Sequence, residues 1–176
     1  MATFDERERV GEDGTARDLA DRGLPASIRS FMKLRHETIV LAEHAPEERL
    51  NDIPAGRAAS LRWLIGHVLV VWDHGLFPKV GDSWRLPPHY HTLFPEGSSP
   101  GNWTVMPPSL DELLRRLRIQ KDDILDATER HLDYPLAEPF LDFATVGEAF
   151  DYLAGEERRC LNEMRAVVAA FDVPLQ

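Results

Sequence analysis

The strongest constraint on the fold is one apolar segment, LRWLIGHVLVVWDHGLF, at residues 61–77. Placed on a helix, its apolar side chains cover most of the circumference, whereas a surface helix carries an apolar stripe on one side only. We therefore predict a buried central helix near residues 60–80. Such a helix must be covered on nearly every side, so the rest of the chain has to supply that cover.

Three further segments have helical character, because their apolar residues recur at the spacing of one helix face. Two of them begin with a capping box, Ser109 with Glu112 and Thr145 with Glu148. No segment alternates between apolar and polar residues over the length of a strand. The sequence therefore predicts an all-α fold, an antiparallel four-helix bundle. Its helices are expected near residues 25–43, 60–80, 109–132 and 145–171.

The connection between the second and third predicted helices, residues 81–108, is unusually long. Long connections inside compact domains are usually either functional covers or disordered segments. This one is rich in aromatic residues, which a disordered linker would lack. We therefore expect a packed cover that contains Trp84, Tyr90, Phe94 and Trp103.

Length and composition suit a single domain. Residues 1–22 are highly charged and are expected to form an N-terminal arm, with the bundle domain at 23–176. A net charge of −10 repels phosphate backbones, which argues against a nucleic-acid partner. The chain has neither an apolar run of about 18 residues nor an apolar N-terminal segment, so we expect no membrane span and no signal peptide. The single cysteine, Cys160, allows no internal disulfide and favours a cytoplasmic location.

Histidines are the first candidates for chemistry. His67 lies in the middle of the buried second helix, where each ring nitrogen needs a partner. It is either a core-edge histidine bonded to a neighbouring helix or a ligand. His74, seven residues later, is expected near the helix end and in solvent. His89 and His91 would face one way in an extended segment, as a metal contact or as loop surface.

The stretch AGEERRCLNEM in the last helix supplies the second set of candidates. Glu156 and Cys160 are four residues apart and project from nearly the same side of the helix, and Glu157 falls close to the middle of its apolar stripe. A carboxylate there is costly unless a metal or an arginine neutralises it. Thiolate, imidazole and carboxylate groups all bind zinc. Alternatively, Glu156 is solvated, Glu157 forms an ion pair and Cys160 is a small buried hydrophobic residue.

The order of these segments resembles a known family. WLIGHVLVVWDHGLF, then LFPEGSSP, PPSLDELL and TVGEAFDYLAGEERRCLNEM are similar to the DinB/YfiT-like metalloenzyme family over roughly residues 25–171. The resemblance implies a four-helix bundle, often dimeric, with a divalent metal, zinc or nickel, held by three histidines. One of these lies midway along the second helix, and two lie four apart on the last helix. On this chain the corresponding positions hold His67, Glu156 and Cys160, of which only the first is a histidine.

Two functions follow from this resemblance. In the first, the chain is a DinB-like metal-dependent transferase or hydrolase, as thiol-dependent relatives are, acting on a small-molecule substrate. His67, Glu156 and Cys160 would hold the metal in one cleft, and Glu157 would be an acid or base beside them. His74 and the aromatic residues of the long connection would line the pocket, namely Trp84, Tyr90 and Trp103.

In the second, the chain is a catalytically degenerate, metal-free bundle that serves as a binding or dimerisation module. An arginine, or protonated His67, would then neutralise Glu156 or Glu157 in place of the metal. A third interpretation, a redox or nucleophilic Cys160, is disfavoured because the nearby glutamates would raise the pKa of its thiol.

Three structural expectations follow. His67, Glu156 and Cys160 should converge in one cleft, since buried polar groups satisfy one another. Without a metal, His67 should hydrogen-bond to a carboxylate. The protein should form a homodimer through helix faces, because the resemblance implies it and because the apolar second helix needs covering.

Overall fold

The structure is a computed structural model that describes residues 23–171. It contains four long helices: α2 (Ala26–Glu43), α3 (Leu61–Gly75), α5 (Leu110–Thr128) and α6 (Val146–Phe171). The connections contain the short helix α4 (Tyr90–Leu93) and three 3₁₀ turns, η1 (Glu47–Arg49), η2 (Phe77–Val80) and η3 (Pro100–Asn102). The described residues form no strand, only an isolated bridge between Pro135 and Thr145. The predicted all-α bundle is therefore confirmed, whereas the arm proposed for residues 1–22 lies outside the described residues.

Each predicted helix starts within one residue of its predicted position. In α3, α5 and α6 side chains cap the free amides of the first turn, whereas α2 follows Pro25 without a side-chain cap. The Ser109 hydroxyl accepts the amide of Glu112 at 3.2 Å. Thr145 and Glu148 form both bonds of a capping box, at 3.3 Å and 3.1 Å. Helix ends were harder to predict. α3 stops at Gly75 rather than near residue 80, because Pro78 has no amide to donate to an α-helical ladder, and the chain continues as the 3₁₀ turn η2.

α5 also ends early, at Thr128 rather than near residue 132. Residues 129–134 turn back towards the start of α6 instead. The carbonyls of Leu132 and Tyr134 accept the amides of Gly147 and Val146 at 2.8 Å and 2.9 Å. These non-local hydrogen bonds compete with continuation of the helix.

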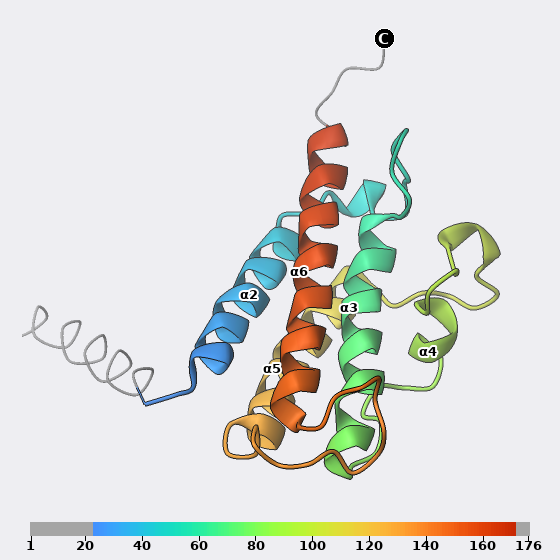
Figure 1. Ribbon diagram of the computed structural model, residues 1–176. Coiled ribbons are helices and arrows are strands. Elements are labelled where there is room, and N and C mark those ends of the chain that lie inside the picture. Colours follow the sequence, from blue (N-terminus) through green and yellow to red (C-terminus); the bar gives the residue numbers. More distant parts are fainter. Residues whose placement is uncertain (1–22, 172–176) are drawn as a thin grey trace, which may run out of the picture.

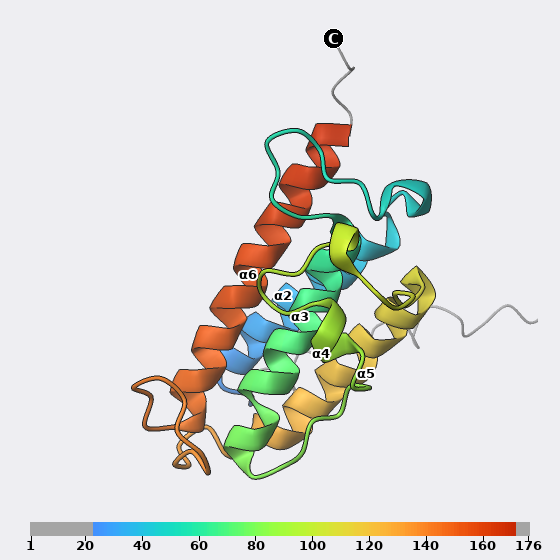
Figure 2. The same cartoon turned by 90° about the vertical axis from the view of Figure 1, so that its right-hand side faces the viewer.

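The four long helices form one bundle in which α2 and α6 run in one direction and α3 and α5 in the other (Figure 1). α3 packs most extensively against α6, while α2 contacts both α5 and α6. Because α3 and α5 are parallel, the chain between them must return along the bundle. This long connection, carrying α4, lies along the outside of α3, as Figure 2 shows.

An aromatic cluster of Phe31, Trp72 and Phe150 joins α2, α3 and α6 inside the bundle. The ring centres are 4.9 Å, 5.3 Å and 5.4 Å apart, in tilted or edge-to-face pairs. Such pairs stabilise a core somewhat beyond their area burial. The cluster lies next to the polar network described below, since Trp72 belongs to both.

The long connection is a packed cover, as predicted, because Tyr90 and Phe94 are fully buried. Gly66 on α3 makes this possible. A Cβ atom at this position would lie 2.4 Å from the Phe94 ring, so only glycine leaves room for it. The cover, α5 and α6 together bury almost all of α3 within one chain. The apolar second helix therefore does not itself require a second copy, and the homodimer stays a prediction.

Among residues 23–171, no helix has the combination of length and hydropathy that crossing a lipid bilayer would require.

Candidate functional site

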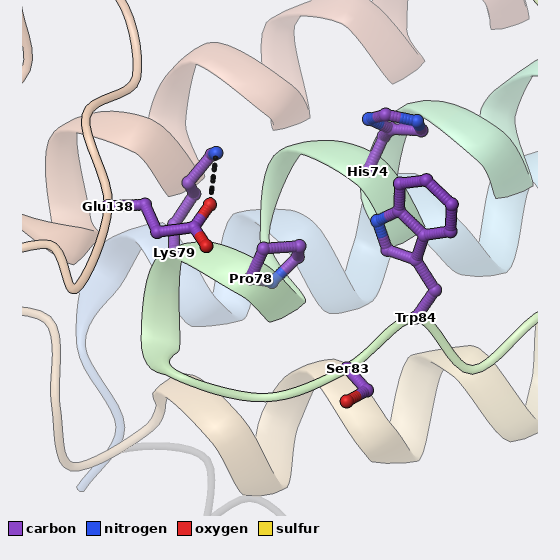
Figure 3. A pocket seen from close by; sticks show the side chains of 6 residues that line it. All are labelled: His74, Pro78, Lys79, Ser83, Trp84 and Glu138. Carbon is purple, nitrogen blue, oxygen red and sulfur yellow. Dashed lines mark hydrogen bonds and ion pairs between the residues drawn. The ribbon is translucent and has the colours of Figure 1, made fainter.

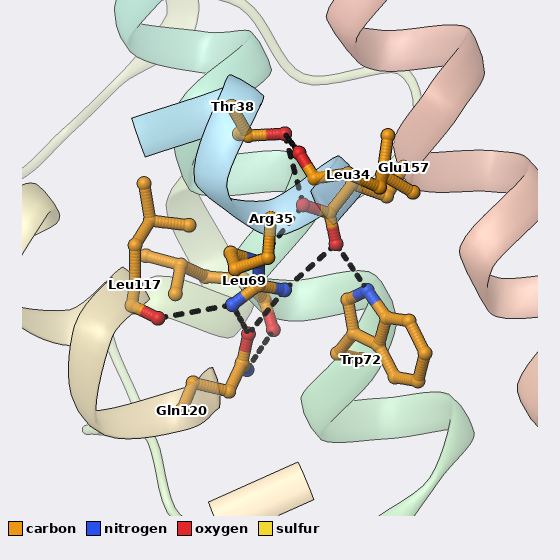
Figure 4. A network of polar contacts seen from close by, with 8 residues as sticks. All are labelled: Leu34, Arg35, Thr38, Leu69, Trp72, Leu117, Gln120 and Glu157. Atoms are coloured by element: carbon orange, nitrogen blue, oxygen red, sulfur yellow. Dashed lines mark hydrogen bonds and ion pairs between the residues drawn. The ribbon is translucent and has the colours of Figure 1, made fainter. Parts of the chain in front are cut away.

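A fully buried ion pair lies at the centre of the bundle. Both oxygens of the Glu157 carboxylate accept hydrogen bonds from the Arg35 guanidinium, each at 2.8 Å, and both side chains are 0% exposed. The same carboxylate accepts the Thr38 hydroxyl at 2.9 Å and the Trp72 indole N–H at 2.7 Å. The two-pronged arrangement is the strongest geometry for an arginine–carboxylate pair. Figure 4 shows these side chains meeting between the helices.

The remaining donors of Arg35 are also occupied. Its Nη1 donates to the Leu117 carbonyl at 3.1 Å and to the Gln120 amide oxygen at 3.2 Å. The Gln120 amide nitrogen in turn donates to the Leu69 carbonyl at 2.8 Å. α2, α3, α5 and α6 therefore all contribute to one satisfied network (Figure 4). A charge pair in a dry interior costs desolvation, and this set of hydrogen bonds offsets that cost.

His67 is held in one orientation on the side of α3 that faces the cover. Its Nδ1 lies 2.8 Å from the Phe94 carbonyl, and its ring stacks on Trp63 with centres 4.3 Å apart. A carbonyl oxygen only accepts, so Nδ1 carries the proton and Nε2 of the neutral ring keeps its lone pair. The expectation of a carboxylate partner is wrong, because the chain places a backbone carbonyl there instead.

Glu156 and Cys160 are neighbours on α6 but lie in different surroundings. Glu156 bonds to Arg159 at 2.9 Å, and its side chain is 28% exposed. Cys160 is in the core, and burial raises the pKa of its thiol to about 12, with the nearby Arg159 offsetting only part of the shift. At neutral pH the sulfur is therefore a protonated, unreactive thiol.

A cleft of about 840 Å³ opens at the end of the bundle where α3 begins, and His67, Glu156 and Cys160 are not among the residues that line it. Its lining includes Trp63 and Arg159, so it adjoins the ring that stacks on His67 and the guanidinium nearest Cys160. Arg57 and Glu163 form an ion pair on its wall at 3.4 Å, and Glu96 lines it as well. The cleft thus presents an indole and charged groups of both signs.

A family model described as the DinB superfamily matches residues 30–164, most of the chain. The protein belongs to the DinB superfamily. A comparison with curated proteins finds no match. Membership agrees with the helical bundle, while the identity of the residues at 67, 156 and 160 has to be judged from their surroundings.

As arranged, the three residues do not present the ligand set that the DinB resemblance implies. No three histidine, cysteine, aspartate or glutamate side chains are grouped to hold a metal anywhere in residues 23–171. Glu156 is engaged with Arg159, and no hydrogen bond joins His67 to Cys160 within the described residues. Glu157, expected beside such a site, is neutralised by Arg35. The donors present therefore do not fit a metal held by these three residues.

The predicted pocket residues divide between two places. Trp103 donates its indole N–H to the Leu93 carbonyl at 2.7 Å and packs edge-on against Phe94, within the cover. Tyr90 is buried there too, and burial together with Glu112 raises the pKa of its hydroxyl to about 12.

His74 and Trp84 lie near the other end of α3, with ring centres 4.4 Å apart. His89 and His91 do not lie in an extended segment as assumed, because α4 is helical. His91 joins the group of His74 and Trp84, whereas His89 packs against Tyr90.

Two important residues of this DinB protein escaped the sequence analysis. Arg35 occupies the apolar face of α2, in register with Phe31 and Thr38, and a charge in that position signals a buried partner. Asp73, on the apolar helix α3, is fully buried and would have given the same signal. In both cases the missing information was which helix faces would meet.

Proposed function

We propose that this DinB-superfamily protein is a binding module that holds no metal at His67, Glu156 and Cys160, and that its cleft takes a small planar molecule carrying charges of both signs. The observation that carries the proposal is the pairing of the α6 carboxylates. Glu156 and Glu157 are each neutralised by an arginine, Arg159 and Arg35 respectively, so neither needs a metal. Such arginine–glutamate ion pairs are expected in a bundle in which arginines have taken the place of the metal ion.

The cleft supports this class of ligand in two ways. Trp63 provides an apolar, aromatic wall, held in place by its indole N–H, which donates to the Ser98 hydroxyl at 2.7 Å. Arg57, Arg159, Glu96 and Glu163 all line the same cleft, so neither sign of charge dominates. An aromatic zwitterion would find a stacking surface and partners for both charges.

The test uses the full-length protein without a histidine tag, labelled with 5-fluorotryptophan. Each of the four tryptophans then gives its own fluorine resonance. An aromatic amino acid series is titrated, and binding in the cleft shifts the Trp63 resonance while that of Trp84 stays unchanged. Arg159→Gln should weaken binding about tenfold, because it removes a charged partner. Matched aromatic carboxylates and amines that carry one charge should bind less tightly. A Trp63 resonance that no member of the series moves would contradict the proposal.

A second candidate is the metal-dependent transferase or hydrolase that the resemblance implies. One observation favours it: the His67 Nδ1 is held by a carbonyl, which leaves Nε2 as the lone-pair nitrogen, as in metal-binding histidines. Glu156 would have to leave Arg159 to join it. Metal analysis after incubation with zinc or nickel separates the candidates. Stoichiometric metal that is lost in both His67→Ala and Cys160→Ser would favour the enzyme over the binding module.

We also propose a homodimer formed through helix faces. Its support is the family resemblance, together with a groove between α2 and α6. The groove is lined by the apolar residues Val40, Leu41 and Val168 and by the polar residues His36, Glu37, His44 and Arg165. Light scattering at micromolar concentration should give twice the chain mass of 20.0 kDa. A monomer under those conditions would refute the dimer without affecting the cleft proposal.

A further inference from the structure

A second buried carboxylate, Asp73, organises a cluster near the C-terminal end of α3. It is 0% exposed and accepts the amides of Arg85 and Leu86 at 2.8 Å and 3.3 Å. Its Oδ2 also lies 2.9 Å from Nε2 of His91. The Asp73 oxygens accept the two amides, and Nε2 of His91 donates its proton to Oδ2 in the same way.

The other nitrogen of His91 has no such partner. Nδ1 is buried and makes no hydrogen bond with any residue of the described range 23–171, and the side chain is only 10% exposed. Buried polar atoms are nearly always hydrogen-bonded, so an unpaired buried nitrogen of this kind indicates a ligand. With the proton on Nε2, Nδ1 of the neutral ring carries a lone pair. A carboxylate that orients the opposite nitrogen is the arrangement typically found behind a metal-binding histidine.

His74 brings a second imidazole to the same place. Its ring centre is 5.2 Å from that of His91, at an interplanar angle of 65°. Zinc–nitrogen bonds of about 2.0–2.1 Å put a ring centre about 3 Å from the ion, so two tetrahedral imidazole ligands have centres about 5 Å apart.

We infer that His91 and His74 together bind one divalent transition-metal ion, of the zinc, nickel or cobalt class. Imidazole nitrogen is a preferred ligand of these ions. Two protein ligands leave the other positions to water or to an added small ligand, so the ion is expected to exchange readily. This site is separate from the cleft beside Trp63 and does not depend on the proposed function.

A pocket of about 530 Å³ beside His74 leaves room for the outer ligands of the ion. It is lined by His74, Trp84, Lys79 and Glu138, whereas His91 does not line it. Figure 3 shows His74 and Trp84 side by side, with Lys79 directed to Glu138, a bond of 3.1 Å. Glu138 therefore offsets the charge of Lys79. Trp84 stacks on His91 with ring centres 4.5 Å apart and is half exposed, so it can move aside as the ion enters.

The experiment titrates zinc into the untagged full-length protein by calorimetry, and cobalt into the 5-fluorotryptophan-labelled protein. One equivalent of zinc should bind, at least about tenfold more weakly in His74→Ala and undetectably in His91→Ala. His89→Ala, which alters a histidine two residues from His91, is the matched control and should bind as the wild type does. Paramagnetic cobalt should broaden the Trp84 fluorine resonance before that of Trp63. Because His74 is exposed, its replacement should leave the circular dichroism spectrum unchanged.

Three results would overturn the inference. They are no zinc binding at millimolar metal, binding that survives unchanged in both variants, and cobalt that broadens Trp63 before Trp84. If the Trp63 effect were lost in His67→Ala, the metal would belong to the cleft, and the metal-dependent enzyme would replace the binding module. Loss of ligand binding in the cleft would leave the His91 site untouched, so the two proposals fail separately.

Discussion

Glu157 and Asp73 are both fully buried carboxylates on long helices, but their partners differ. Glu157 faces Arg35, a permanently charged group whose other donors reach carbonyl or amide oxygens. Asp73 faces His91, an imidazole whose second nitrogen has no partner in residues 23–171. Burial alone therefore does not mark a functional site. The complete set of partners gives the Glu157 pair a structural role, whereas the unpaired nitrogen of His91 is the observation on which the proposed metal site rests.

The largest effect should come from breaking the complete network. In Glu157→Leu, Arg35 keeps its charge in the dry interior without a counter-charge, which should lower the free energy of unfolding by about 3–5 kcal/mol. Urea denaturation followed by circular dichroism measures the loss. Glu156→Leu, one position earlier and paired at the surface, is the matched control and should cost less than about 1 kcal/mol.

The double variant Arg35→Met/Glu157→Leu sharpens this test. Removing both charges also removes their desolvation, so the double variant should be more stable than Glu157→Leu alone. Equal losses in Glu156→Leu and Glu157→Leu would show that the buried pair does not have the structural role given to it here.

The next effect concerns the second carboxylate. Asp73→Asn keeps the shape of the side chain but replaces one carboxylate oxygen with an NH₂ group. The carboxylate accepts hydrogen bonds from N–H groups of Arg85, Leu86 and His91, and an NH₂ group cannot accept them. We expect a loss of about 3 kcal/mol from the unpaired buried donors. Hydrogen exchange should speed up at the amides of residues 85 and 86 more than in the centre of α3. Uniform acceleration along α3 would contradict a local role for Asp73 in holding the cover.

A smaller effect should follow where the cover packs on α3. In Gly66→Ala the new methyl group collides with Phe94, and the overpacking should cost about 2 kcal/mol. The displacement should also disturb the bond between His67 Nδ1 and the Phe94 carbonyl, seen in the imidazole nitrogen resonances. Gly155→Ala is the matched control, since its Cβ meets no atom within 4 Å, and it should stabilise α6 by about 0.5–1 kcal/mol. Destabilisation by both alanines would refute the packing explanation.

The smallest effect at neutral pH concerns Cys160. Its pKa is raised by burial from 9.0 to about 12, so the native protein holds this proton where the unfolded chain releases it. Stability is therefore unaffected below about pH 9 and falls as the pH rises from 9 towards 12. In Cys160→Ala this part of the alkaline loss should disappear, leaving that of Tyr90 and other groups. Thiol labelling should be slow in the native state and fast in urea, and rapid native labelling at pH 8 would contradict the burial.

The fold could be predicted further than the site. The apolar α3, the caps at Ser109 and Thr145, and the spacing of apolar residues are local signals, and they located the helix starts. The pairing of Arg35 with Glu157 could be predicted only in part from the sequence. Both residues lie in apolar stripes, but they are 122 positions apart, and only the assembled bundle shows that the stripes face each other. The position of His91 depends on the short helix α4, inside a connection that carries no clear periodicity, so sequence spacing gave the wrong geometry.

The sequence separations within the Arg35 network also bear on how the chain assembles. Glu157 reaches Arg35, Thr38 and Trp72 across 122, 119 and 85 positions, so its hydrogen bonds cannot form inside any single hairpin. Until α2, α3 and α6 are all in place, water is the better partner for both charges. The ion pair of Arg35 and Glu157 therefore does not stabilise a partly docked bundle. A helix shifted by one turn would leave one of these two charges buried without its partner. The network should therefore form late in folding and make the final docking of the helices a single cooperative step.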